Sequence, residues 1–251
     1  MDALWDHARY CDETETEIAR FAEALVAADP AGPVPGCPDW TSADLAEHVG
    51  IVHRWCTHLV ATGATARIPF SDVPVEEMPE GDRSAWILQG GERLLATLRA
   101  ADPDTPVWSW GADQHVRFWS RRMFHETAVH RADAERAAGR TPEFDPIAAG
   151  DGIEEFLANI STAGRARKAL TALDGAGETL HLHATGSEGE WMITLEPAGF
   201  RWERGHGKGT VAVQGSASDL LLLVHGRIDA GGLTVFGDQD LLDRWLAVTR
   251  F

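Results

Sequence analysis

Cysteine is scarce in this chain, and its scarcity narrows the class of protein. The 251 residues include only three cysteines, Cys11, Cys37 and Cys56, and none of them forms a C-x-x-C pair. An odd number of cysteines without such spacing favours neither a disulfide framework nor a thiolate zinc site. We interpret all three as small buried hydrophobic residues, in a protein of a reducing, cytoplasmic compartment.

Basic residues and long apolar runs are also lacking. The chain has 22 Lys and Arg residues against 39 Asp and Glu residues, a formal net charge of −17. Binding to nucleic acid or to an anionic membrane surface depends on basic side chains that neutralise phosphate, so we expect neither partner. No apolar run approaches the roughly 20 residues that span a bilayer, and no basic segment precedes an apolar one at the N-terminus. The sequence therefore predicts a soluble protein.

Four segments have the apolar periodicity of amphipathic helices. They run from Leu4 to about Ala28, from about residue 42 to Val60, from Ser84 to Ala100 and from Gln114 to Ala138. Thr41 and Asp44 have nearly the spacing of a capping box at the start of the second segment, and Gly139 and Pro142 end the fourth. Four helices joined by irregular loops predict a bundle.

After about Arg165 the pattern changes to short strands separated by Gly-rich turns. Alternating runs at 179–184 and 190–195 predict a hairpin, and a further strand at 210–213 leads into apolar segment 219–224 and amphipathic segment 238–248. We therefore predict the α+β fold class. A four-helix bundle occupies residues 1–163, and a small α+β domain occupies residues 164–251.

Two of the predicted helices carry titratable residues in their apolar stripes. His48 shares a face with Leu45, and Glu126 and His130, one turn apart, share a face with Met123. A buried carboxylate costs several kcal/mol unless it is partnered or protonated, so Glu126 needs a cation, an arginine or hydrogen bonds. A metal ion shared by His48, Glu126 and His130 would satisfy all three. Two imidazoles and one carboxylate are a usual set of zinc ligands, which leaves a fourth position open.

Other interpretations of these residues remain open. A single histidine in an apolar stripe is more often a hydrogen-bonded core residue than a ligand. Glu126 and His130 can instead pair with each other along the helix, or with Arg122 and Arg54. Three further histidines fall on other faces of their helices, where we expect surface or supporting positions: His53, His58 and His125.

Two helical motifs and several C-terminal ones together resemble a known family. The helical motifs are PDWTSADLAEH at 38–48 and RRMFHETAVHRADAE at 121–135, and the C-terminal ones are GEW at 189–191, VAV at 211–213, DLLL at 219–222 and GR at 226–227. Over nearly the whole chain they resemble the mycothiol-dependent maleylpyruvate isomerase family, within the DinB-like metal-binding four-helix bundles. The resemblance therefore implies a DinB-like bundle followed by that family's C-terminal domain.

The resemblance implies metal ligands at His48, Glu126 and His130, with Zn²⁺ as the divalent ion, and a catalytic arginine at Arg227. It also implies mycothiol, the low-molecular-weight thiol of actinobacteria, as cofactor or co-substrate. A thiol at the open position of zinc becomes a thiolate, which is the nucleophile. Addition to a small electrophile then gives one of two outcomes. Rotation and elimination complete a cis–trans isomerisation, whereas release of the adduct completes an S-transfer.

Two other functions remain open alongside this enzyme. A metal-dependent hydrolase would use metal-bound water and need no thiol, and a non-catalytic protein would bind a thiol or small ligand without forming product. The partners that we expect are a low-molecular-weight thiol and a small-molecule electrophile, bound by a monomer or homodimer.

Supporting residues can also be named for the metal ligands and for a carboxylate substrate. Asp44 and Asp133, one turn from the ligand histidines, are expected to accept hydrogen bonds from their other ring nitrogens. Arg201 and Arg204 could join Arg227 in binding a carboxylate. A solvated position at the rim is the more frequent role for strand arginines such as these two.

Overall fold

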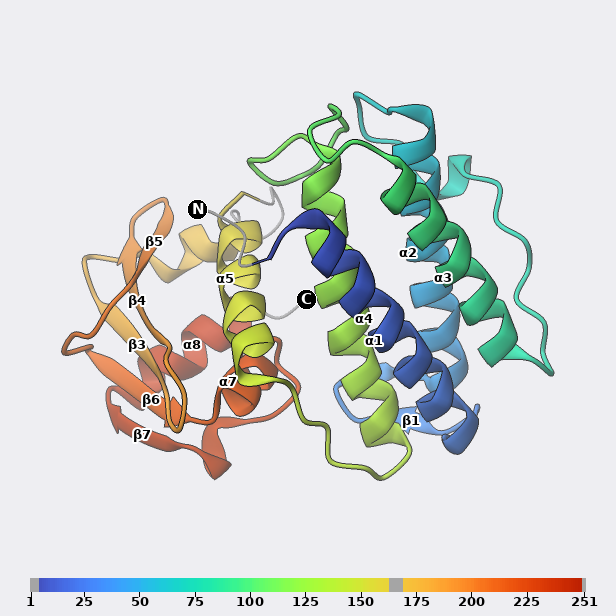
Figure 1. The fold of residues 1–251 in the computed structure, drawn as a ribbon. Coiled ribbons are helices and arrows are strands. Elements are labelled where there is room, and N and C mark those ends of the chain that lie inside the picture. The colour runs from blue at the N-terminus through green and yellow to red at the C-terminus, as the bar shows by residue number, and fades with distance from the viewer. Residues whose placement is uncertain (1–4, 163–168, 250–251) are drawn as a thin grey trace. The chain divides into compact units, whose positions relative to one another are not determined.

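The computed structural model describes residues 5–162 and 169–249 and divides into two compact units, Met1–Pro142 and Glu143–Phe251 (Figure 1). The predicted domain boundary, between residues 163 and 164, lies outside the described residues. The division falls earlier because helix α5 (Pro146–Thr162) contacts elements of the C-terminal unit, mainly α7 (Ala217–Val224). The α+β class is confirmed, since a helical unit precedes a unit that contains a sheet.

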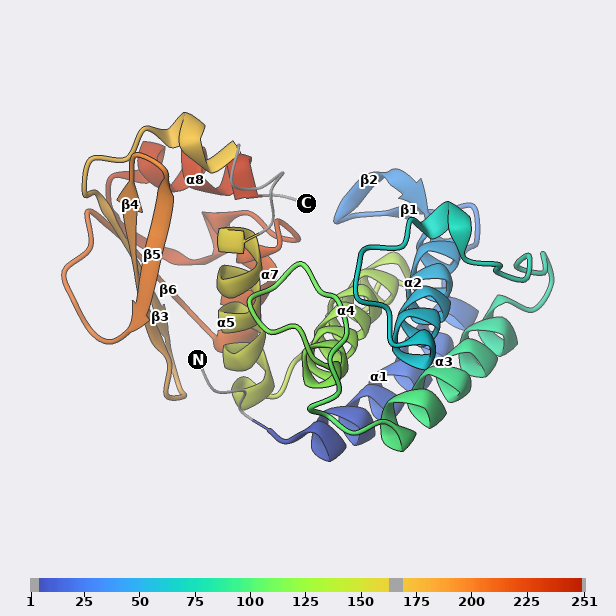
Figure 2. The same cartoon turned by 90° about the horizontal axis from the view of Figure 1, so that it is seen from above.

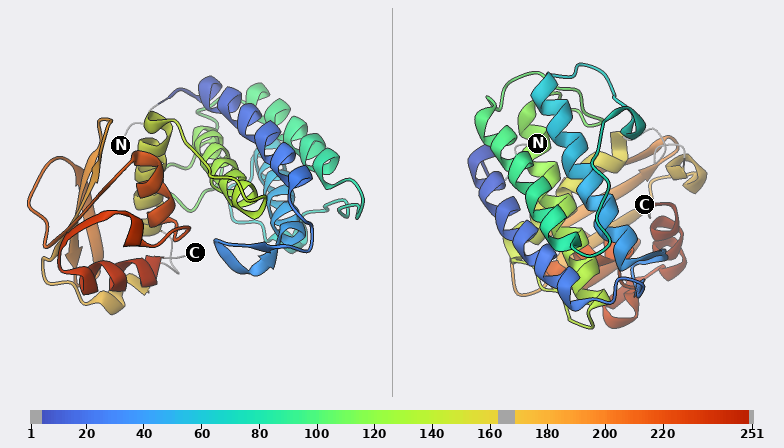
Figure 3. Two further views of the ribbon diagram at one scale, coloured as in Figure 1. Left: turned by 90° about the horizontal axis from the view of Figure 1, so that it is seen from below. Right: turned by 90° about the vertical axis from the view of Figure 1, so that its right-hand side faces the viewer.

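The described part of the N-terminal unit is built from four long helices. They are α1 (His7–Ala27), α2 (Ser42–Thr62), α3 (Arg83–Ala100) and α4 (Val116–Ala137). These are the four predicted helices, although Leu4 lies outside the described residues. Helices α1 and α2 each contact both α3 and α4, and Figure 3 shows the four side by side. A short hairpin, β1 (Pro33–Val34) and β2 (Cys37–Thr41), precedes α2, and one turn of 3-10 helix, η1 (Phe70–Asp72), follows it.

Tryptophans join α2 to α4 in the bundle core. The rings of Trp55 on α2 and Trp119 on α4 are buried and meet edge to face, with centroids 5.2 Å apart. Trp108 and Trp110, from the loop before α4, complete the cluster, and Trp119 Nε1 donates to the Trp108 carbonyl at 2.9 Å. Aromatic pairs of this geometry stabilise beyond the area they bury, so the cluster fixes the two helices relative to each other.

The start of α2 is fixed by the predicted capping box. The Thr41 hydroxyl accepts a hydrogen bond from the Asp44 backbone N–H at 3.2 Å, and the Asp44 carboxylate accepts one from the Thr41 backbone N–H at 2.8 Å. Two backbone donors that a helix terminus leaves without partners are thereby satisfied. The cap sets the register in which α2 presents His48.

The C-terminal unit is a five-stranded sheet with helices on one face. In order across the sheet, the strands are β5 (Gly199–Arg204), β4 (Glu190–Glu196), β3 (Thr179–Ala184), β6 (Val211–Gly215) and β7 (Thr234–Gly237). β3 and β6 run parallel, and the other neighbours run antiparallel. Figure 2 shows α5, α7 and α8 (Gln239–Thr249) against one face, and short 3-10 turns η2 (Thr171–Leu173) and η3 (Ala230–Gly232) complete the connections.

Alternation along the strands separates a core face from an outer face. Leu180 and Leu182 of β3 are buried in one cluster with Leu220 of α7 and Trp245 of α8. Because successive side chains of a strand point to opposite faces, His181 and His183 lie on the other face. The fold of this unit thus places two histidines on the face that the helices leave uncovered.

Helix α5, which the sequence pattern did not predict, carries acidic residues on its buried face. Glu154 is buried, and its carboxylate accepts hydrogen bonds from Trp191 Nε1 at 3.0 Å and from Arg204 Nη2 at 2.6 Å. A buried carboxylate is tolerated when charged and polar donors surround it in this way.

Among the helices that the structure describes, none has both the length and the apolar character needed to cross a bilayer.

Candidate metal centre

Helices α2 and α4 bring His48, Glu126 and His130 together. His48 Nε2 lies 3.1 Å from Glu126 Oε1, and His130 Nε2 lies 3.3 Å from the same oxygen. Glu126 and His130 are one turn apart on α4, which places both side chains on the face that meets α2. One donor atom from each residue lies within 4.8 Å of the other two.

An arginine on α4 keeps the carboxylate of Glu126 ionised. Arg122, one turn before Glu126, donates from Nη2 to Glu126 Oε2. Burial alone would raise the pKa of Glu126, but Arg122 and hydrogen bonds from His130 and His48 outweigh it, and the pKa lies well below its usual range. The alternative pairing of Glu126 with Arg122 is therefore present together with both histidine contacts. Arg54 does not join it, since its guanidinium donates to the carbonyls of Gly50 and Trp86.

His130 is oriented by a second carboxylate. Its Nδ1 lies 2.9 Å from Oδ2 of Asp133, a fully buried residue one turn further along α4. Burial opposes a charged imidazole, but hydrogen bonds to Asp133 and Glu126 raise the pKa of His130 to about 9. The bond to Asp133 fixes the ring so that Nε2 faces Glu126 and His48. A carboxylate behind a ligand histidine is the usual supporting arrangement of a metal site.

Asp44 does not provide the same support for His48. Among the described residues its carboxylate bonds to Thr41, as the cap of α2, and not to His48. The expectation that Asp44 accepts from a ligand histidine is therefore wrong. The capping role takes precedence because the residue stands at the third position of the helix, where a carboxylate meets the unpaired N–H groups.

The Trp40 side chain, from β2, contacts both imidazoles. Its ring centroid lies 4.8 Å from that of His48 and 6.1 Å from that of His130, the latter nearly parallel at 26°. The side chain of His48 remains 35% exposed, whereas that of His130 is 9% exposed. The group therefore has a buried side, toward Asp133, and an accessible side, at His48.

The donor set fits a divalent transition metal. Two imidazole nitrogens and one carboxylate oxygen form a three-residue set typical of catalytic zinc sites. Each donor atom is presented from a helix, and two of the three residues have a further partner that holds the side chain in place. His48, Glu126 and His130 could therefore hold such an ion, with one position available for a small molecule.

Of the three other histidines predicted on these helices, His53 and His125 are buried, contrary to part of the prediction, whereas His58 is half-buried. His53 is fully buried, and its Nε2 lies 2.9 Å from the hydroxyl oxygen of Thr127. His125 is 2% exposed and packs edge-on against Phe124. The expectation of a surface position is wrong for both, because the bundle buries more than one face of α2 and α4. The prediction that the three cysteines are buried is confirmed for Cys11 and Cys56, whereas Cys37 is half-buried.

The predicted arginines belong to the C-terminal unit. Arg227, just after α7, is buried, and its Nη1 donates to the His225 carbonyl at 2.8 Å. Arg204 pairs with Glu154, and Arg201 lies 3.2 Å from Glu196 on the neighbouring strand. Arg204 thus has the structural role of neutralising a buried carboxylate. The catalytic role of Arg227 stays a prediction.

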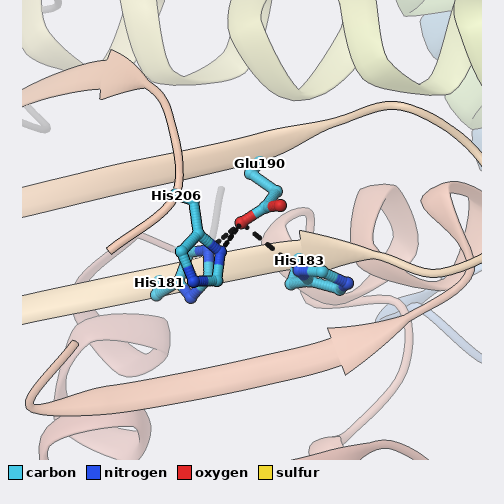
Figure 4. A group of neighbouring side chains, drawn as sticks. All are labelled: His181, His183, Glu190 and His206. Carbon is cyan, nitrogen blue, oxygen red and sulfur yellow. Dashed lines mark hydrogen bonds and ion pairs between the residues drawn. The ribbon is translucent and has the colours of Figure 1, made fainter. Parts of the chain in front are cut away.

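A second group of potential ligands, which the sequence pattern did not predict, lies in the C-terminal unit. His181, His183, Glu190 and His206 each offer one donor atom, and these atoms also lie within 4.8 Å of one another (Figure 4). The signal that could have found them is His-x-His in a predicted strand, since alternate residues share a face, followed by a glutamate in the partner strand of the hairpin.

Two family models match the chain. They are the "Mycothiol maleylpyruvate isomerase N-terminal domain" over residues 11–135 and the "MDMPI C-terminal domain" over residues 148–244. A crystal structure of the mycothiol-dependent maleylpyruvate isomerase is 16% identical, with a TM-score of 0.60, and the match covers 94% of this chain and 95% of that chain. A histidine-to-alanine mutant of that enzyme is 15% identical, with a TM-score of 0.56 and the same coverage. These likenesses show the fold. No curated protein sequence matches the chain.

Proposed function

Because the chain belongs to the mycothiol maleylpyruvate isomerase family, we propose that it is a thiol-dependent enzyme whose metal ion is held by His48, Glu126 and His130. Mycothiol is the proposed thiol and Zn²⁺ the proposed metal. The substrate is a small electrophile, which undergoes cis–trans isomerisation or receives the thiol. A reducing, cytoplasmic setting accords with this chemistry, and Cys11, Cys37 and Cys56 form no disulfide.

One observation carries the proposal. The two imidazoles and the carboxylate come from two helices, yet they converge within hydrogen-bond distance at Glu126 Oε1, in the part of the chain that the N-terminal family model matches. A structural ion pair would need neither the second histidine nor the tryptophan that contacts both rings. This convergence is what a three-residue metal site requires.

The residues around the site prepare these donors. Arg122 keeps Glu126 ionised by engaging its other oxygen, and Asp133 orients the ring of His130 so that its Nε2 is directed at the site. Trp40 lies against both rings and restricts their rotation. When bound, a zinc ion supplies the positive charge that lowers the pKa of a coordinated thiol, so that the thiol is present as thiolate at neutral pH.

Metal content and thiol dependence test this proposal. We call the group His48, Glu126 and His130 the helical site. Untagged protein should contain close to one equivalent of zinc bound at the helical site, and His48→Ala should lose that metal and the activity together. Glu126→Gln should keep the fold but weaken zinc binding by about tenfold or more, because a neutral amide is a poorer ligand than a carboxylate. His58→Ala, on the same helix but outside the group, is the matched control and should retain both metal and activity.

Activity assays then separate the candidate functions. Product formation from cis-unsaturated or other electrophilic acids should require mycothiol. Activity of the metal-loaded protein without any thiol would instead identify a metal-dependent hydrolase. Stoichiometric binding of the thiol, with no product across a broad panel of electrophiles, would identify a binding protein. Full metal content in His48→Ala and Glu126→Gln would overturn the site assignment itself.

A further inference from the structure

The outer face of the C-terminal sheet carries a compact group of three histidines and one glutamate. His181 and His183 are alternate residues of β3 and therefore share that face. Glu190 of β4 stands directly opposite His183 in the antiparallel register. His206 reaches the same point from the loop between β5 and β6, as Figure 4 shows.

All three imidazoles are directed at one carboxylate oxygen. Glu190 Oε2 lies 2.8 Å from His181 Nε2, 2.6 Å from His206 Nδ1 and 3.3 Å from His183 Nδ1. His183 Nδ1 is buried, and although it lies 3.3 Å from Glu190 Oε2, it makes no hydrogen bond of suitable geometry with any described residue. The group thus presents one carboxylate oxygen and three imidazole nitrogens around a common point, and one of those nitrogens has its bonding capacity unused.

The charge of Glu190 has no permanent counter-charge. Among the described residues, its carboxylate contacts only these three histidines and no lysine or arginine. Glu126, by contrast, is paired with Arg122. A cation bound among the histidines would supply the missing positive charge.

We propose that His181, His183, Glu190 and His206 bind a second divalent transition-metal ion, for which Zn²⁺ has the best-suited chemistry. Three imidazole nitrogens exclude Mg²⁺ and Ca²⁺, which select oxygen ligands. Four protein ligands complete a tetrahedral shell, which is the mark of a structural site. The site is separate from the helical one and goes beyond the proposed enzyme function.

The present positions of the donors are close to those that such an ion needs. In a tetrahedral zinc site, neighbouring ligand atoms lie roughly 3.4 Å apart, and here all four lie within 4.8 Å of one another. His206 can adjust most easily, since its side chain is 79% exposed and it stands between Gly205 and Gly207. His181 is nearly buried and provides the fixed point of the group.

Binding there would tie the loop after β5 to the sheet. The loop connects Arg204 to Val211 and includes the exposed Lys208, two residues from His206. A metal bond to His206 would hold that loop against β3 and β4. Trypsin cleavage after Lys208 therefore reports whether the loop is held.

Zinc titration of the metal-stripped full chain tests the proposal, with a chromophoric chelator as competitor. His48→Ala serves as the parent, because it removes the proposed helical site. This parent should bind one equivalent of zinc, and adding His206→Ala or His183→Ala should each weaken that binding at least tenfold. Adding His58→Ala should leave it unchanged. Equal affinity in the parent and in both cluster variants, or no zinc binding by the parent, would overturn the second site.

The same titration keeps the two proposals apart. Two equivalents in the unaltered chain and one in His48→Ala support both sites. One equivalent in each protein supports the site at Glu190 on the sheet alone and counts against the helical site.

Proteolysis adds an independent readout. Zinc should slow trypsin cleavage after Lys208 at least fivefold in the His48→Ala protein. In the double variant that also carries His206→Ala, zinc should not change the cleavage rate. Cleavage equally fast with and without zinc in the parent would overturn the closure of the site by His206.

Discussion

Ionisable residues buried within the bundle differ in whether an opposite charge accompanies them. Glu126 and His130 have charged partners, and the pKa of each shifts toward the ionised form. Within the part of the chain that the structure describes, His53 has only the Thr127 hydroxyl as hydrogen-bond partner, and its Nδ1 is buried without one. Burial lowers the pKa of His53 to about 4. Histidine is therefore stabilised as a cation at position 130 and as a neutral ring at position 53.

The low pKa of His53 predicts a loss of stability in acid. Between pH 6.5 and about 4, the unfolded chain binds a proton at this residue that the folded protein does not, so the free energy of unfolding falls as pH falls. From pH 7 to pH 5 the loss amounts to about 2 kcal/mol. Urea unfolding at several pH values should show this slope, and His53→Gln, which keeps a donor for Thr127, should lose it. Parallel pH profiles for the two proteins would contradict the assignment.

At the scale of the helices, α2 and α3 pack closely where a glycine meets a tryptophan. A Cβ atom placed on Gly50 would lie 1.8 Å from Cζ3 of Trp86. Trp86 is buried, and the Arg54 guanidinium lies over its ring at 3.8 Å from the centroid. Neither the ring nor the arginine has room to withdraw without disturbing the helix pair.

Gly50→Ala should therefore destabilise the N-terminal unit by about 2–3 kcal/mol, through overpacking at a buried contact. The matched control is Gly150→Ala in α5, where the new methyl group would stand 3.5 Å from Trp191. That change should be neutral or should stabilise by about 0.5–1 kcal/mol, because alanine has the higher helix propensity. Chemical unfolding of the two variants measures the difference. Equal stabilities would show that α2 and α3 can separate at no cost.

Local periodicity explains which elements the sequence could predict. Helices α1 to α4 follow from apolar spacing and from a capping box, both of which involve residues a few positions apart. Helix α5 was missed because Glu154 interrupts its apolar face, and the residues that accommodate this carboxylate, Trp191 and Arg204, lie far along the chain. A charged residue can be predicted to be buried only when the distant residues that neutralise it are known.

In the candidate sites too, only the residues placed by local spacing could be predicted from the sequence. His48, Glu126 and His130 could be named because each stands in the stripe of its own helix, and Asp133 because it stands one turn from His130. The contact of Trp40 with both rings depends on how the β1–β2 hairpin folds, which no spacing specifies. The group around Glu190 likewise needs the register of β3 and β4 and the path of the following loop.

On the scale of the whole molecule, the two family domains correspond to the two compact units. The residues proposed to hold the catalytic metal, His48, Glu126 and His130, lie in the first unit, whereas Arg227 lies in the second. A metal ion alone does not select among electrophiles. If the substrate is a carboxylate, its recognition requires a donor such as a guanidinium, which binds carboxylates through two parallel hydrogen bonds.

Arg227→Ala therefore tests whether the C-terminal unit serves the chemistry proposed for the bundle. Loss of a charged hydrogen bond to substrate should raise KM about tenfold or more, while zinc content and the thermal midpoint stay those of the unaltered protein. Arg227→Lys should recover part of the loss, because lysine keeps the charge but not the paired geometry. Arg201→Ala, an exposed arginine paired with Glu196, is the control and should leave KM unchanged. Unaltered kinetics in Arg227→Ala, or a fall in the thermal midpoint that accounts for the lost activity, would assign this arginine to the fold through its bond to the His225 carbonyl.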